Sequence, residues 1–201
     1  MTLPAALPSA PDLAVEPMAQ EHDAASFERV YREHFAFVWR NLRRVGVATS
    51  ALDDAAQDVF VVVHRRLGEL GGPRLIKPWL SAILLRVAAD YRRRARRRDE
   101  PTRSESDGPG LDTMADPRGL SPQQTAEEAD RLRLLHRVLD DLDDAKREVF
   151  VLAELEQLSC PEIAEALGLP TNTVYSRLRH ARREFSQALA RHKLSDEWRL
   201  R

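Results

Sequence analysis

The residues best suited to bind a partner are six arginines that fall within seven positions, at residues 92–98 of a 201-residue chain. Arginine keeps its charge at all physiological pH values, and its planar fork of N–H donors pairs well with phosphate. Such a run indicates either a solvated helix end or a surface that holds a polyanion. The overall composition does not decide between them, because 31 basic residues are balanced by 32 acidic ones and the net charge is -1.

Charge is distributed unevenly along the chain. Residues 86–98 contain seven arginines and one aspartate, and residues 99–130 contain nine acidic residues and two arginines. Residues 171–193 contain six basic residues and one acidic residue. Two basic segments therefore flank an acidic one, which favours a shared polyanionic partner such as nucleic acid. A charge run that only solubilises a helix end is the alternative explanation for residues 92–98.

The second basic segment belongs to the most specific pattern in the chain, "SCPEIAEALGLPTNTVYSRLRHARREF" at residues 159–185. Ser159 and Glu162 have the spacing of a capping box at a helix start, and Gly168 suits a left-handed helix end. A three-residue turn then separates a short helix from a long basic one. This order is typical of a helix-turn-helix, with small and apolar residues where the two helices must pack closely. The alternative is a plain helical hairpin.

A helix-turn-helix places the start of its second helix in the major groove of DNA, where side chains reach base edges. Arginine can pair with guanine or with phosphate, so the sequence does not separate these two roles. The residues expected to contact the duplex lie at the start and on the outward face of this helix: Thr171, Asn172, Thr173, Ser176, Arg177, Arg179, His180 and Arg183.

The first half of the chain shows three stretches with apolar residues at helical spacing, and a loop rich in glycine and proline precedes the third. Pro78 suits the first turn of this third helix, which continues into the arginine run. Trp79 lies beside Lys77 near that loop. An aromatic ring beside a cation is suited to stacking on an unpaired base, although a tryptophan that anchors the core is an equally good explanation.

Neither half shows the alternating pattern of β-strands, so the fold class expected is all-α, with two small helical domains joined by a flexible acidic linker. We divide the chain into a disordered tail at 1–25, a first domain at 26–98, a linker at 99–120, a second domain at 121–193 and a C-terminal tail at 194–201.

The sequence offers little for catalysis. Asp53, Asp54 and Asp58 have no acidic partner on an obvious facing segment, and Tyr91 occupies an apolar stripe position. Cys160 is the single cysteine, so it forms neither an internal disulfide nor a zinc site. We therefore expect no enzyme activity, no catalytic residue, no metal and no cofactor. A DNA-processing enzyme would need clustered carboxylates for metal ions or an activated nucleophile.

The chain also lacks features of membrane insertion and secretion. No uncharged apolar stretch reaches the roughly 18 residues that a membrane span needs. The N-terminal segment lacks a basic region and contains prolines at 4, 8, 11 and 17, which argues against a signal peptide. We expect a cytoplasmic protein.

Taken together, these motifs resemble the extracytoplasmic-function group of bacterial sigma factors, over residues 27–98 and 121–189. "DDAAQDVFVVVHRR" is similar to the helix with which the family contacts the polymerase clamp. "KPWLSAILLRVAADYRRRARRR" is similar to the segment that melts the −10 promoter element, and residues 159–185 are similar to the module that reads the −35 element. The resemblance implies a sigma region 2-like first domain and a sigma region 4-like second domain.

The resemblance also implies partners and roles. The partners are core RNA polymerase, promoter DNA and an anti-sigma factor. The implied function is to bind the polymerase, read −35 as duplex and capture −10 as melted strand; a stand-alone helix-turn-helix transcriptional regulator is the alternative. Polymerase contact falls on Asp54, Gln57 and Asp58. Contact with the −10 element falls on five residues: Lys77, Trp79, Arg86, Arg92 and Arg93.

Overall fold

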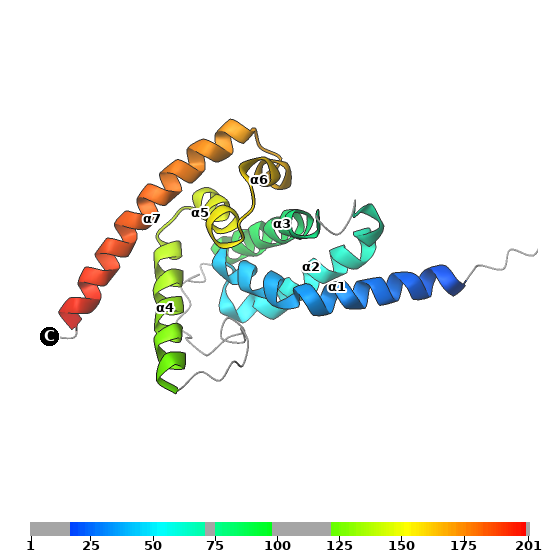
Figure 1. Ribbon diagram of the computed structural model, residues 1–201, viewed down its shortest axis with the longest axis horizontal. Coiled ribbons are helices and arrows are strands. Elements are labelled where there is room, and N and C mark those ends of the chain that lie inside the picture. The colour runs from blue at the N-terminus through cyan, green and yellow to red at the C-terminus, as the bar shows by residue number, and fades with distance from the viewer. Residues whose placement is uncertain (1–16, 71–74, 98–121, 200–201) are drawn as a thin grey trace, which may run out of the picture.

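The computed structural model describes residues 17–70, 75–97 and 122–199, and every regular element within these ranges is helical (Figure 1). The expected all-α class is therefore confirmed. The expected linker at 99–120 lies outside the described residues. No described helix is long and apolar enough to cross a membrane.

Three helices form the first unit: α1 (Pro17–Arg44), α2 (Leu52–Arg66) and α3 (Ile76–Arg97). Short 3-10 turns at Thr49–Ala51 and Leu67–Glu69 flank α2. The apolar stripes expected from the sequence meet at the centre of this bundle, where Leu42, Leu52 and Leu84 are fully buried. Burial of one such side chain stabilises the fold by about 1.5 to 3 kcal/mol, so this core holds the basic end of α3 in place.

The second unit contains α4 (Pro122–Asp140), α5 (Asp144–Phe150), α6 (Cys160–Leu167) and α7 (Thr171–Arg199). A π-helical segment, η5 (Val151–Leu155), extends α5, and no residue pattern predicted it. Asp143 caps α5 by accepting a hydrogen bond from the Lys146 backbone N–H at 2.9 Å. This bond satisfies a backbone donor at the start of α5 that has no partner within the helix.

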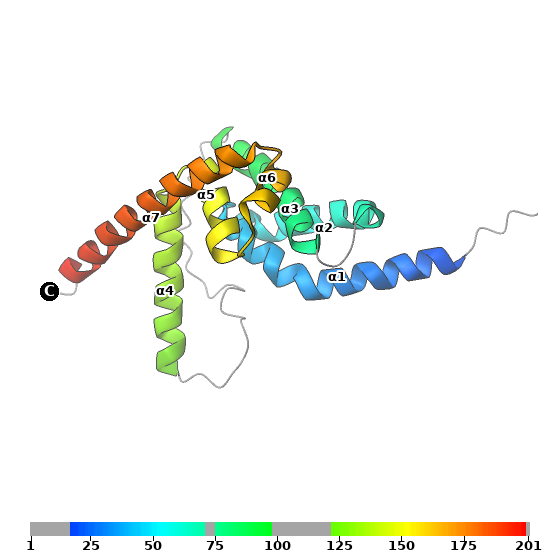
Figure 2. The same ribbon diagram turned by 45° about the horizontal axis from the view of Figure 1, so that its top comes forward.

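The two units are docked against each other. Both views show α5 and α6 lying beside α3 (Figure 1 and Figure 2). A single cluster of buried apolar residues runs through both units and includes Leu84 and Ala88 of α3 as well as Val149 of α5 and Ile163 of α6. The docking therefore removes apolar surface of each unit from water.

Two helix boundaries differ from the sequence-based expectation. Helix α1 already begins at Pro17, within the segment 1–25 expected as a disordered tail. Proline is tolerated in the first helical turn because it has no N–H to lose there. Helix α7 continues to Arg199, through most of the expected C-terminal tail 194–201. Residues 194–199 contain no glycine or proline that would end a helix.

Candidate nucleic-acid interface

The helix-turn-helix begins with a complete capping box. The Ser159 backbone N–H donates to the Glu162 carboxylate at 2.8 Å, and the Ser159 hydroxyl accepts from the Glu162 backbone N–H at 3.4 Å. The Ser159 hydroxyl also donates to the Glu162 carboxylate at 2.6 Å, and this bond, followed by the one from the Ser159 backbone N–H, lowers the pKa of Glu162. Gly168 ends α6 in the left-handed region, at φ 64° and ψ 37°. Because the turn is closed by local hydrogen bonds, the direction in which α7 leaves α6 is fixed by α6 itself.

Helix α7 is held on the unit by buried and polar contacts along its inner face. Val174, Leu178 and Ala181 are buried. The rings of Phe150 and Phe185 stack with their centroids 4.4 Å apart. Lys146 and Glu184 form an ion pair of 2.9 Å between α5 and α7. The opposite face of α7 is consequently free to meet a groove.

The eight residues expected to contact duplex DNA all lie on the first turns of α7. Asn172, Ser176, Arg179 and Arg183 are exposed. The other four, Thr171, Thr173, Arg177 and His180, are partly buried. The structure therefore brings these residues together on one helix, with the exposed arginines two and three turns from its start.

Two further side chains of α7 lie close to these eight residues. Tyr175 is 56% exposed on α7, one turn before Arg179, and it was not among the residues selected from the sequence. Tyr175 could have been identified from the sequence as an aromatic residue within the helix expected to enter the groove. Arg182, which flanks the exposed face, forms an ion pair of 2.7 Å with Glu154 of the π-helical segment.

The described part of the arginine run, at the end of α3, contains one buried member and four exposed ones. Arg93, Arg94, Arg96 and Arg97 are exposed, whereas Arg92 is only 6% exposed. Arg92 donates a hydrogen bond of 2.6 Å to the Val45 carbonyl.

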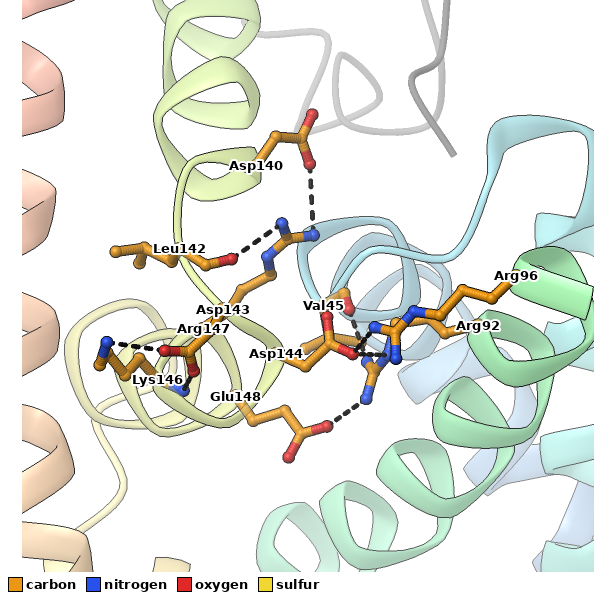
Figure 3. A network of polar contacts seen from close by, with 10 residues as sticks. All are labelled: Val45, Arg92, Arg96, Asp140, Leu142, Asp143, Asp144, Lys146, Arg147 and Glu148. Atoms are coloured by element: carbon orange, nitrogen blue, oxygen red, sulfur yellow. Dashed lines mark hydrogen bonds and ion pairs between the residues drawn. The ribbon is translucent and has the colours of Figure 1, made fainter. Parts of the chain in front are cut away.

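Arg92 also forms ion pairs with Asp144 and Glu148 of α5 (Figure 3). Carboxylates of the second unit occupy the Arg92 guanidinium in the docked arrangement, so contact between Arg92 and promoter DNA stays a prediction for a state in which the units are separated. A helical wheel could not reveal this, since the partner carboxylates lie about 50 residues away.

The remaining residues expected at the −10 element are spread along α3. Lys77 is exposed, with its ammonium 5.9 Å from the centroid of the Phe37 ring. Trp79 is partly buried and packs against the core, as a core anchor with an accessible edge would. Arg86 and Arg93 are exposed further along the same helix. These four residues are accessible in the docked arrangement.

The residues expected to contact polymerase lie together on the exposed face of α2. Asp54, Gln57 and Asp58 are all exposed. Asp58 accepts a hydrogen bond of 2.9 Å from the Tyr91 hydroxyl. Burial of the Tyr91 ring, followed by the hydrogen bond and charge of Asp58, raises the pKa of Tyr91 to about 12. Tyr91 therefore stays protonated and ties α3 to α2.

Beside these residues lies an open groove of about 690 Å³ between α1 and α2. Its lining is largely apolar and includes the ring pair Tyr31 and Phe60, with centroids 4.7 Å apart, together with Val61 and Gln57. Asp53, at the edge of the groove, accepts a hydrogen bond of 3.0 Å from the Trp39 indole. The carboxylates and the groove together form a mixed polar and apolar surface.

Comparisons with known proteins agree with this architecture. The family model "Sigma-70, region 4" matches residues 132–185, which contain the helix-turn-helix. The RNA polymerase sigma factor NccH of Alcaligenes xylosoxydans xylosoxydans is 29% identical over 186 residues, covering 89% of this chain and 94% of that protein. The ferric citrate uptake sigma factor FecI of Escherichia coli is 32% identical over 152 residues, covering 74% of this chain and 82% of FecI.

Solved structures give the same result for the fold. CnrH in complex with the cytosolic domain of CnrY matches 86% of this chain and 95% of that chain, with a TM-score of 0.55 and 25% identity. The sigma factor RpoE of Bartonella quintana, in complex with the anti-sigma factor NepR, matches 80% of this chain with a TM-score of 0.54 and 19% identity, which supports the fold alone. From the identity to FecI and the match to region 4, the chain belongs to the extracytoplasmic-function group of the sigma-70 family of RNA polymerase sigma factors.

Proposed function

We propose that this sigma factor binds core RNA polymerase and selects promoters by reading two DNA elements with its two helical units. The observation that carries the proposal is the helix-turn-helix of α6 and α7, which has an exposed, arginine-rich outer face and matches sigma region 4. The stand-alone regulator is the less favoured alternative, because the relatives match both units of the chain and carry sigma-factor names.

The proposed −35 contacts are the exposed side chains of α7. Asn172 and Ser176 can donate to or accept from base edges, and Arg179 or Arg183 can pair with guanine or with phosphate. Arg177 is partly buried and lies in the field of the Glu148 carboxylate of α5, so it is a weaker candidate than the exposed arginines.

The proposed −10 contacts are Lys77, Trp79, Arg86 and Arg93 of α3, which are accessible or partly accessible in the docked arrangement. An unpaired base stacked on an aromatic ring contributes about 1 to 3 kcal/mol, which helps to offset the cost of unstacking it from the duplex. Arg92 can join these residues once Asp144 and Glu148 release it.

The proposed polymerase contact is the exposed face of α2 with Asp54, Gln57 and Asp58, next to the apolar groove. Carboxylates one turn apart suit a basic ridge on the partner, and the groove can accept apolar side chains. CnrH and RpoE were each solved with a CnrY or NepR partner, and we propose that an anti-sigma factor also binds this chain.

A transcription assay tests the function. The purified chain is added to sigma-free bacterial core polymerase, with promoter fragments from the genome that encodes it as templates. Specific transcripts that appear only with both components support the proposal. A chain that binds its DNA site tightly by itself and yields no transcript with any core polymerase would instead be a stand-alone regulator. We do not expect the chain to have any catalytic activity in this assay.

A further inference from the structure

Two carboxylates of α5 face the basic end of α3 across the boundary between the units (Figure 3). Asp144 and Glu148 lie one helical turn apart. The Asp144 carboxylate is 3.2 Å from Arg92 Nε and also pairs with Arg96, while Glu148 pairs with the other end of the Arg92 guanidinium. The Arg92 and Glu148 side chains are 7% and 14% exposed. This arrangement presents two anionic groups to one arginine fork.

A second polar contact lies at the end of the π-helical segment. The Glu156 carboxylate accepts hydrogen bonds of 2.9 Å from the Asn41 amide and from the Arg44 guanidinium, both of α1. The Arg44 and Glu156 side chains are only 12% and 6% exposed. Because Asn41 and Arg44 lie on one face of α1, a single carboxylate of the second unit bridges both.

A glycine permits the close approach of the units. Gly46, at the end of α1, has φ +93°. A Cβ built at this position would lie 2.3 Å from Arg147 Nη1, so a larger residue would displace the end of this guanidinium from its present position. Arg147 itself is held by Asp140 at 3.2 Å and donates to the Leu142 carbonyl at 3.3 Å. The surface of the first unit is therefore shaped to receive α5.

Glu148 faces arginines of both DNA-binding elements. Burial raises its pKa, while the charge and hydrogen bond of Arg92 oppose that rise, and the charge of Arg177 on α7 also opposes it. Arg92 was expected to contact the −10 element and Arg177 the −35 element. One carboxylate thus lies in the field of an arginine from each.

We propose that Asp144 and Glu148 act as an internal substitute for DNA phosphate, so that the docked chain excludes promoter DNA from Arg92 until the second unit separates from the first. This inference rests on the proposed function, since it assumes that Arg92 serves DNA in the separated state. Carboxylate and phosphate bind the same N–H donors of arginine, so one excludes the other from Arg92.

The docking is suited to being reversible. Burial raises the pKa of Glu148 despite its partner, so the ionised carboxylate loses more by desolvation than Arg92 returns. In addition, the buried Asn41 Oδ1 and Arg147 Nε have no hydrogen-bond partner among the described residues. These costs oppose docking, and a ligand that prefers the separated state can shift the equilibrium toward it.

The first test uses Glu148→Lys in the full chain, which places a positive charge beside Arg92 and leaves every residue proposed to contact DNA unchanged. The matched control is Glu127→Lys, an identical charge change on the exposed face of α4, where Glu127 pairs with its neighbour Arg131. Small-angle scattering measures the radius of gyration. Fluorescence anisotropy measures affinity for a random-sequence duplex of roughly 30 base pairs, which reports phosphate contact without a promoter.

We expect Glu148→Lys to enlarge the radius of gyration and to bind the duplex about fivefold or more tightly than the control, because the apparent affinity is limited by the fraction of separated chain. Equal radii and equal affinities in the two variants would overturn the proposal. A wild-type chain that is already extended in solution would also overturn the proposal.

A charge exchange provides the second test and guards against a variant that misfolds. Glu156→Arg should also enlarge the radius of gyration, because it brings two guanidinium groups together. Arg44→Glu combined with Glu156→Arg should restore the compact form, since the pair is re-formed with its charges reversed. Failure of the double variant to compact, with normal helix content by circular dichroism, contradicts the docking.

The assays separate this inference from the proposed function. If wild-type chain directs transcription by core polymerase while Glu148→Lys and its control have the same radius and affinity, the docking proposal fails and the function stands. If Glu148→Lys separates the units and no core polymerase is activated by any variant, the function fails and the docking stands.

Discussion

Arg92 of α3 and Glu148 of α5, 56 residues apart in the sequence, form an ion pair that joins the two helical units. Arg92 belongs to the run of arginines that made the sequence look like a nucleic-acid binder, yet the fold buries it. The same chemistry that suits a guanidinium to phosphate suits it to a carboxylate of its own chain. If Arg92 contacts DNA as proposed, the docked structure competes with DNA for this residue.

The buried position of Glu148 predicts a pH dependence of docking. Burial raises the pKa of Glu148 in the docked state, so protonation favours that state. The stability that protonated Glu148 adds to the docked state is fully present below the ordinary pKa of 4.5. It is lost as the pH rises through the raised pKa of the docked state. We expect the radius of gyration to decrease as the pH falls from neutral toward 4.5.

Small-angle scattering across this range, with circular dichroism to confirm that the helices persist, measures the effect. Glu148→Gln removes the titrating group and should be compact at every pH, whereas Glu127→Gln should titrate like wild type. A radius that grows as the pH falls, with intact helices, contradicts the expected sign.

The left-handed backbone at the turn between α6 and α7 predicts that adding a methyl group at Gly168 lowers the stability of the fold. Gly168 has φ +64°, and a Cβ there would meet open space, so the cost of Gly168→Ala is backbone strain alone. A residue with a Cβ in the left-handed region costs about 1 to 2 kcal/mol. Gly68→Ala is the matched control, because Gly68 also faces open space and does not need a positive φ. Thermal unfolding should show a lower midpoint for Gly168→Ala alone.

Local features of this fold were predictable, because they depend on neighbours within one turn of helix. The cap at Asp143, the capping box at Ser159 and the glycine turn at Gly168 all follow from residue types at fixed short spacings. The all-α class followed from apolar spacing in the same way.

The docking of the units was not predictable, because it depends on residues brought together from distant parts of the chain. Asn41 and Glu156 are 115 residues apart, and neither has a sequence neighbour that marks it as an interface residue. A run of arginines also gives no sign that one of them is buried. Helix periodicity shows which positions share a face, and it does not show which face another unit will cover.

The exposed position of Arg179 on α7 predicts that this arginine contacts −35 DNA, and its substitution distinguishes contact with a base from contact with phosphate. Arg179 is exposed on α7. If it pairs with a base, Arg179→Ala in the complex with core polymerase should weaken −35 binding by about 1 to 3 kcal/mol at that base alone. If it pairs with phosphate, affinity should fall for all sequences, with the salt slope reduced by about 0.9.

Affinity measured over a salt series for matched and mutated −35 duplexes distinguishes these outcomes. Arg131→Ala, on the exposed surface of α4, is the control for the loss of one positive charge. An Arg179→Ala variant that behaves like this control would show that Arg179 does not contact DNA.

Reversal of a charge among the exposed carboxylates of α2 should weaken polymerase binding and leave the proposed DNA-binding surfaces intact. Asp54 is exposed, whereas Asp58 is engaged by Tyr91, so Asp54→Lys is the change least able to disturb the fold. If a basic ridge of the polymerase meets this face, a lysine there should weaken binding at least tenfold, which corresponds to about 1.4 kcal/mol. Asp130→Lys, on the exposed face of α4, carries the same charge change as a control. Binding to labelled core polymerase should fall for Asp54→Lys alone, and equal affinities would place the polymerase contact on another surface.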